Sequence, residues 1–198
     1  MIVYGDILSG NCYKVKLVCA LLDLPHQWVH VSILAKETRT DEFLAKNPAG
    51  QIPLLETDDG KFLAESNAIL HFLAEGSSLL PKDRFQKAKV LEWQFFEQYS
   101  HEPYIAVARY IAKYLGLPQE RQAEYDAKQS GGHKALQIME QQLVCTPYLL
   151  GEQLTLADIS LFAYTHVADE GGFDLSRYHA ITEWVKRIKS EPKFIAMA

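Results

Sequence analysis

The chain has 198 residues, 48% of them hydrophobic, and is therefore long enough to bury one large core or two smaller ones. Its 20 basic and 25 acidic residues give a net charge of -5, and no basic block is dense enough to follow a phosphate backbone, so we expect no nucleic-acid partner. No apolar run approaches the ~20 residues of a membrane span, so we also expect no membrane insertion.

The first half of the chain alternates between strand and helix patterns. Short apolar runs predict strands, apolar residues recurring every three or four positions predict helices, and Asp58-Asp59-Gly60 predicts a hairpin turn. The elements are expected, in chain order, at residues 2–4, 11–22, 28–31, 41–46, 53–57, 61–63 and 66–74. The resulting order is βαβαββα, which is the thioredoxin-like plan.

The second half of the chain is predicted to be all helical. Residues 76–83 shift abruptly to turn formers and no strand pattern follows them, so we place domains at 1–77 and 84–198. A long helix is expected over 85–114, bent at Pro103 because proline removes a backbone hydrogen bond. Further helices are expected at residues 119–143, from 155 onward and at 180–189.

A capping box is predicted at the start of one of these helices. In Thr155-x-x-Asp158 the hydroxyl can cap the first turn while the carboxylate reaches back to the cap residue. We therefore assign Asp158 a structural role rather than a catalytic one.

Two segments carry the strongest functional pattern. In Gln51-Ile52-Pro53 the proline opens a short apolar run, and the bond before it can be cis at low cost. A cis bond would turn the Ile52 amide and carbonyl outward, where they can pair with a bound peptide as an added strand does. Glu65-Ser66 stands where a helix begins, and its free amides and hydroxyl suit a carboxylate. The pattern predicts a small-peptide site; the plainer alternative is a proline-bounded hairpin followed by an ordinary helix cap.

In their order and spacing these two segments resemble the glutathione transferase family, and the resemblance extends from the first strand to the last helix. It implies an α/β plus all-α fold: a thioredoxin-like domain that binds glutathione, followed by a helical-bundle domain that carries the electrophile site. In that family the residue before the cis-proline holds the cysteinyl backbone of glutathione, and the Glu-Ser pair holds its γ-glutamyl end. The resemblance therefore implies substrate-binding roles for Ile52, Pro53, Glu65 and Ser66.

Two more residues are candidates for binding the glycine carboxylate of glutathione. Gln51 lies beside Ile52, and Lys36 lies in the preceding loop. Lys36 is the less secure candidate because several basic residues cluster there, and a solvated loop would look the same.

Ser9 and Asn11 are the candidate donors to the glutathione sulfur. They lie between the first strand and the first helix, at the sheet edge where α/β proteins bind ligands. A free thiol has a pKa near ~8.5, and lowering it by about two units requires roughly 2.7 kcal/mol of preferential thiolate stabilisation. The resemblance implies this role for Ser9, which matches the serine-type enzymes, or for Asn11, which matches some bacterial relatives. Helix capping is the alternative for both, and Tyr4 is a weaker candidate that we expect in the core.

The cysteines indicate a reducing compartment. Cys12, Cys19 and Cys145 are odd in number and lack paired spacing, so we expect a cytoplasmic protein. Ser9-Gly10-Asn11-Cys12 has the spacing of a Cys-x-x-Cys motif whose first thiol is replaced by serine. We expect Cys12 to be a packed thiol, with a thiol-disulfide role as the alternative, and Cys19 to lie in the core.

The electrophile is expected to bind against the helical domain. Tyr99, His101, Tyr104 and Arg109 can line an open aromatic pocket there, and we take Tyr104 and Arg109 as its substrate-binding residues. The alternative is an aromatic stripe that packs in the core.

These expectations lead to a glutathione transferase that uses no metal and attacks a small electrophile with a glutathione thiolate. A glutathione-dependent peroxidase or disulfide reductase would apply the same thiolate to an O-O or S-S bond. A noncatalytic interaction module on the same fold is the third possibility. Family resemblance also implies a homodimer.

Overall fold

The computed structural model describes residues 1–197 and divides into two compact units. The first unit comprises residues 1–77 together with the segment that begins at Pro192, and the second comprises residues 78–191. The C-terminal segment is bound to the first unit by a 2.7 Å hydrogen bond from the Tyr13 hydroxyl to the Ile195 carbonyl, and by an ion pair between Lys193 and Asp23. Across residues 1–197, no helix is both long and apolar enough to cross a membrane.

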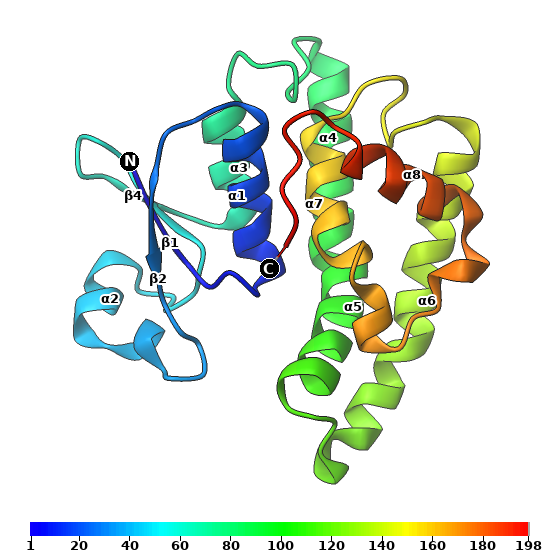
Figure 1. The fold of residues 1–198 in the computed structure, drawn as a ribbon, viewed down its shortest axis with the longest axis horizontal. Coiled ribbons are helices and arrows are strands. Elements are labelled where there is room, and N and C mark those ends of the chain that lie inside the picture. Colours follow the sequence, from blue (N-terminus) through cyan, green and yellow to red (C-terminus); the bar gives the residue numbers. More distant parts are fainter. Residues whose placement is uncertain (198) are drawn as a thin grey trace. The chain divides into compact units, whose positions relative to one another are not determined.

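The first unit is built on a four-stranded mixed sheet with the strand order β2-β1-β3-β4 (Figure 1). Strand β1 is parallel to β2 and antiparallel to β3, and β3 forms a hairpin with β4. The elements are β1 (Ile2–Gly5), α1 (Gly10–Leu21), β2 (Gln27–His30), α2 (Asp41–Lys46), β3 (Leu54–Glu56), β4 (Phe62–Ala64) and α3 (Ser66–Ala74). The predicted thioredoxin-like order is confirmed.

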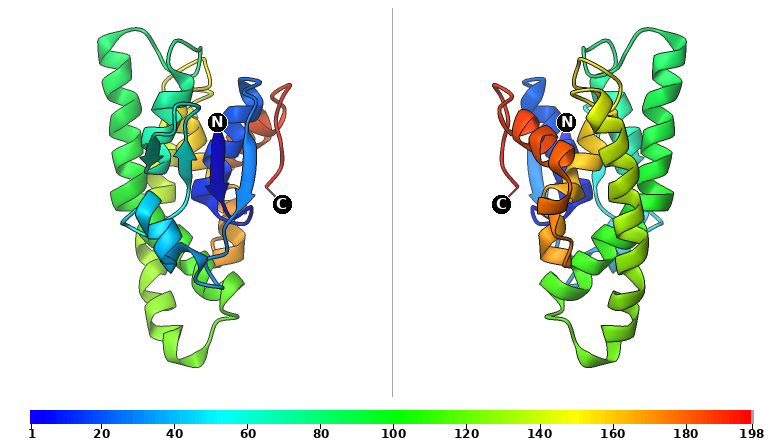
Figure 2. Two further views of the ribbon diagram at one scale, coloured as in Figure 1. Left: turned by 90° about the vertical axis from the view of Figure 1, so that its left-hand side faces the viewer. Right: turned by 90° about the vertical axis from the view of Figure 1, so that its right-hand side faces the viewer.

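Helices cover both faces of this sheet. Helices α1 and α3 lie side by side on one face, and α2 lies on the other (Figures 1 and 2). At the end of β1, a Cβ on Gly5 would lie 2.9 Å from the sulfur of Cys12 and 3.1 Å from the Trp28 ring. Because that spacing is below ordinary van der Waals contact, only glycine lets β1 run this close to the first turn of α1.

The second unit is all helical, as predicted (Figure 1). Its α-helices are α4 (Arg84–Phe96), α5 (Glu102–Arg109), α6 (Gln122–Cys145), α7 (Leu156–Thr165) and α8 (His179–Lys189). The helix expected over 85–114 is continuous from Arg84 to Tyr114, but π-helical turns at Glu97–His101 and Tyr110–Tyr114 interrupt its α-helical hydrogen bonding. Pro103 stands in the first turn of α5 and cannot donate to the carbonyl four residues earlier, which accounts for the first interruption.

Two glycines in the middle of α6 leave room for aromatic rings that pack directly against the helix backbone. A Cβ on Gly131 would overlap the ring of Tyr104, and one on Gly132 would overlap the ring of Phe173. This close packing explains why α6 contains two glycines, although each weakens a helix by roughly 1 kcal/mol relative to alanine.

The predicted capping box at Thr155 and Asp158 is present, and all ten residues of α7 are buried. Asp158 is fully buried and also accepts hydrogen bonds from the Leu149 amide at 2.8 Å and from the Trp184 indole at 3.0 Å. One carboxylate thus joins the start of α7 to the preceding loop and to α8.

Candidate functional site

Ser9 is the N-cap residue of α1. Its backbone is extended, and its Oγ accepts a 3.4 Å hydrogen bond from the Cys12 amide. This is the capping geometry that the sequence offered as the alternative to a catalytic role. Capping uses Oγ as an acceptor, so the hydroxyl proton of Ser9 can still be donated to a second partner.

Asn11 connects the starts of two helices. Its Oδ1 accepts a 2.7 Å hydrogen bond from Lys14 Nζ in α1 and a 3.1 Å hydrogen bond from Ser66 Oγ, the first residue of α3. The predicted thiol donor and the predicted γ-glutamyl residue are therefore in direct contact. Lys14 was not anticipated from the sequence, where a lysine in the first turns of a helix is ordinarily a solvated residue.

The Ile52-Pro53 peptide bond is cis, the geometry allowed for in the sequence analysis. The loop that leads to it is held by the buried side chain of Asn47, which donates to the Gln51 carbonyl at 2.8 Å and accepts from the Ala49 amide at 3.2 Å. Among residues 1–197, none makes a hydrogen bond to the amide or the carbonyl of Ile52. The sequence analysis did not anticipate this role of Asn47 in holding the loop; its signal was an Asn directly before a Pro-Ala-Gly turn.

Lys36 and Gln51 are both exposed. They lie in two loops that are connected by a hydrogen bond from Arg39. Lys36 adopts a left-handed conformation, with φ of 59°, at the start of the 3₁₀ turn Glu37–Arg39. Arg39 Nη1 then donates to the Ala49 carbonyl at 3.2 Å. The structure therefore connects the two loops that carry the candidates for the glycine carboxylate.

Glu65 precedes α3 in an unusual backbone conformation. Its φ is 68° and its side chain makes no capping hydrogen bond to the helix. Positive φ is costly for a residue with a Cβ, and such residues concentrate at functional sites. The Glu65 side chain is exposed, whereas Ser66 is buried.

Cys12 is fully buried, as expected for a packed thiol. Burial raises the pKa of the Cys12 thiol to about 12, although a hydrogen bond with Ser9 opposes the shift. Burial likewise raises the pKa of Cys19 to about 11. Neither thiol is therefore appreciably ionised near neutral pH, and thiolate is the nucleophilic form.

The four candidates in the second unit have different environments. Arg109 is buried and donates from Nε to Glu170 Oε2 at 2.6 Å, and His101 is buried 2.9 Å from the hydroxyl of Thr165. Tyr104 is half-buried with its ring against Gly131, whereas Tyr99 is 80% exposed. Their burial and bonding thus differ, and substrate binding by Tyr104 and Arg109 stays a prediction.

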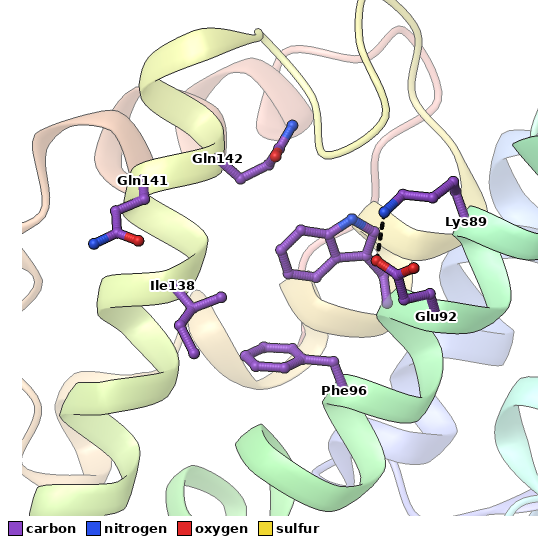
Figure 3. A pocket seen from close by; sticks show the side chains of 7 residues that line it. Lys89, Glu92, Phe96, Ile138, Gln141 and Gln142 are labelled. Atoms are coloured by element: carbon purple, nitrogen blue, oxygen red, sulfur yellow. Dashed lines mark hydrogen bonds and ion pairs between the residues drawn. The ribbon is translucent and has the colours of Figure 1, made fainter.

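A pocket of about 400 Å³ lies between α4 and α6, and none of the predicted substrate residues lines it (Figure 3). An ion pair between Lys89 and Glu92 stands on its α4 side. The lining residues are Lys89, Glu92, Trp93, Phe96, Ile138, Gln141 and Gln142. Over the described chain, residues 1–197, no three His, Cys, Asp or Glu side chains cluster as a metal site requires.

Comparison with protein families gives two matches along the chain. The glutathione S-transferase N-terminal domain matches residues 8–75, and the glutathione S-transferase C-terminal domain matches residues 93–192. The first match contains every candidate site residue of the first unit except Tyr4.

Two solved bacterial structures are similar over nearly the whole chain. A glutathione S-transferase from Pseudomonas fluorescens Pf-5 is 60% identical with a TM-score of 0.98, and the match covers 99% of this chain and 98% of that one. A possible glutathione S-transferase from Rhodopseudomonas palustris is 47% identical with a TM-score of 0.95, covering 99% of this chain and 89% of that one.

Curated relatives are of two kinds. The glutathione S-transferase-like protein LUC7 from a Fusarium species is 30% identical over 197 residues, which cover 93% of this chain and 86% of that protein. Elongation factor 1-gamma from Artemia salina is 35% identical over 144 residues, which cover 70% of this chain but only 33% of that protein. The chain thus spans about a third of the length of this elongation factor. From the paired domain matches and the full-length similarity to the bacterial structures, we conclude that the chain belongs to the glutathione S-transferase family.

Proposed function

We propose that this protein is a glutathione transferase whose first unit binds reduced glutathione and stabilises its thiolate for attack on an electrophilic carbon. The observation that carries the proposal is the 3.1 Å bond between Ser66 and Asn11, because it joins the residue assigned to the γ-glutamyl end to a candidate donor for the sulfur.

Each part of glutathione has a chemically suitable partner in this proposal. The cysteinyl main chain pairs with the amide and carbonyl of Ile52, in the manner of an added strand. The exposed carboxylate of Glu65 attracts the γ-glutamyl ammonium, while Ser66 and the first amides of α3 bind its carboxylate. Gln51 and Lys36 bind the glycine carboxylate.

The chemistry then depends on ionising the thiol. Donors at the start of α1, from Ser9 or Asn11, favour the thiolate, and the proton passes to solvent. The sulfur lone pair forms a carbon–sulfur bond while the leaving group departs with its electron pair. The protein supplies orientation and thiolate stabilisation, so the reaction needs no group from Cys12.

A noncatalytic role is the second candidate, because elongation factor 1-gamma proteins are among the relatives. A peroxidase or disulfide reductase would use the same site. Calorimetry with reduced glutathione, followed by assays with 1-chloro-2,4-dinitrobenzene, cumene hydroperoxide and a glutathione mixed disulfide, separates these functions. We expect binding and the highest kcat/KM with the chlorinated substrate. Absence of binding by folded protein would reject the proposal, and binding without turnover would favour the noncatalytic role.

We further propose that the protein is a cytoplasmic homodimer. All three cysteines are unpaired, which fits a reducing compartment. Large apolar side chains are exposed on both helices that line the α4–α6 pocket, including Phe95 at 60% and Val144 at 71%, and exposed apolar surface is used in many dimer interfaces. Light scattering after size exclusion should give twice the chain mass, and a Phe95→Glu variant should shift the protein toward monomer.

A further inference from the structure

A buried lysine, Lys14, lies in α1 close to the start of the helix. Lys14 has no exposed surface, and its Nζ donates a 2.7 Å hydrogen bond to Asn11 Oδ1. Taking an ammonium group out of water is costly unless it is well bonded. A lysine that is fully buried beside a candidate binding site is therefore a candidate for a role in that site.

The bonds at Asn11 fix the orientation of its side-chain amide. An ammonium group only donates hydrogen bonds, so the Asn11 atom that faces Lys14 must be the carbonyl oxygen Oδ1. The hydroxyl of Ser66 donates to the same oxygen at 3.1 Å. Two donors on Oδ1 turn Nδ2 away from both partners, and they polarise the amide so that Nδ2 becomes a stronger donor.

The charge of Lys14 acts in the same direction at this end of the helix. Burial is the main cause of the raised pKa of Cys12; the charge of the Asp6 carboxylate also raises that pKa, and the Lys14 ammonium lowers it by a smaller amount. The positive charge of Lys14 therefore offsets part of the effect of the Asp6 carboxylate at the first turn of α1.

We propose that Lys14 is a positioning residue which, with Ser66, holds Asn11 so that its amide donates to the sulfur of bound glutathione. This role rests on the proposed function and adds a residue to it. It also makes thiol ionisation depend on the contact between the starts of α1 and α3.

Two substitutions of Lys14 separate its hydrogen bond from its charge. Lys14→Met removes both, whereas Lys14→Gln removes the charge and keeps an N–H donor on a side chain one bond shorter. Ultraviolet titration of the bound thiolate should show a pKa about one unit higher in Lys14→Met, which is a tenfold loss of thiolate well below the pKa, and a smaller rise in Lys14→Gln. Affinity for S-methylglutathione, which has no ionisable thiol, should change by less than about threefold.

Lys16→Met is the matched control. It removes the same charge from the same helix, but Lys16 lies over the Trp28 ring at 5.8 Å and makes no bond to Asn11. The thiol pKa in Lys16→Met should equal that of the unmodified protein. An equal rise in both lysine variants would show a general charge effect and overturn the positioning role.

A double-mutant cycle with Asn11→Ala tests whether Lys14 acts through Asn11. In the Asn11→Ala background, Lys14→Met should produce no further rise in the thiol pKa. A full additional rise, or no rise in Lys14→Met alone, would overturn the proposal. If the Lys14 variants do not fold, Ser66→Ala removes the other donor to Oδ1 and should raise the pKa less; an unchanged pKa there would also overturn it.

These outcomes are distinct from a failure of the proposed function. Unmodified protein that binds neither glutathione nor S-methylglutathione would reject the function itself. Unmodified protein that binds both, with a lowered thiol pKa that is unaffected by Lys14→Met, would reject only the role of Lys14.

Discussion

Ser66 and Asn11 are 55 positions apart in the chain, yet the hydroxyl of one donates to the side-chain oxygen of the other. Ser66 is the first residue of α3, and Asn11 lies in the first turn of α1. Two helix starts that were singled out for different parts of the ligand, the sulfur and the γ-glutamyl end, thus form one network. Variants at either start should therefore be measured for both ligand affinity and thiol pKa.

Ser9→Ala should have two separable effects. Loss of the N-cap should lower the free energy of unfolding by about 1 kcal/mol. Loss of the hydroxyl donor should raise the pKa of bound glutathione, measured by ultraviolet titration, more than it weakens binding. Ser9→Thr retains the hydroxyl and should behave nearly as the unmodified protein. If the pKa does not move in Ser9→Ala, the donor is Asn11 or the backbone amides.

Glu65→Gln should weaken glutathione binding about tenfold without changing the thiol pKa, because the carboxylate is expected to meet the ammonium end, far from the sulfur. Calorimetry measures the first effect and thiolate titration the second. Glu75→Gln, at the other end of α3, is the control that removes the same charge away from the site. Equal affinities in the two variants would contradict the role of Glu65.

The three cysteines should differ in reactivity. Cys145 is exposed, whereas Cys12 and Cys19 are buried and have pKa values raised to about 12 and about 11. Iodoacetamide at pH 7.5 should therefore modify Cys145 rapidly and the other two only after denaturation, as read by mass spectrometry. Rapid labelling of Cys12 in native protein would point instead to thiol-disulfide chemistry.

Asp158→Ala should destabilise the fold by about 3 kcal/mol or more, because it leaves buried donors of Leu149, Thr155 and Trp184 without their acceptor. Denaturant unfolding measures the loss. Asp174→Ala, which removes the cap of an exposed 3₁₀ turn, should cost far less. Activity per folded molecule should be unchanged in both, and a selective loss of activity in Asp158→Ala would assign it a catalytic role.

His166 should make stability depend on pH. Burial lowers the pKa of His166 to about 4, below the ~6.5 of an unfolded histidine. Between these values the unfolded chain binds more protons, so the free energy of unfolding should fall as the pH falls from 7 to 4.5, on the order of 2 kcal/mol from this group. His166→Gln cannot titrate and should show a correspondingly flatter profile. Parallel profiles for the two proteins would contradict this assignment.

Local signals explain why most elements could be located from the sequence. Helices α2 and α3 begin and end where predicted, and Thr40 Oγ1 caps α2 by accepting from the Phe43 amide. Caps, turns and apolar periodicity all act within a few residues, so they can be read from the chain. The π-helical turn at Tyr110–Tyr114 had no such signal, since the apolar pattern continues through it.

The site was predictable only in part, for a different reason. The two peptide-binding segments have distinctive residue types, but Lys14 and Asn47 gain their importance from burial, which depends on contacts far along the chain. Lys14 donates a hydrogen bond to Asn11, and Ser66, which belongs to another helix, donates to the same Asn11 oxygen. Periodicity indicates which face of a helix is apolar, but it does not show that a polar side chain such as Lys14 is buried in the folded protein.

The hydroxyl of buried Tyr13 is bonded to Ile195, so α1 is completed by a segment that leaves the ribosome only after the whole second unit. During translation, residues 1–77 therefore emerge before the acceptor for Tyr13 exists, and that hydroxyl must stay hydrated until the second unit has been made. Emergence of the segment that begins at Pro192, rather than synthesis of residues 1–77, is the point at which α1 can reach its final packing.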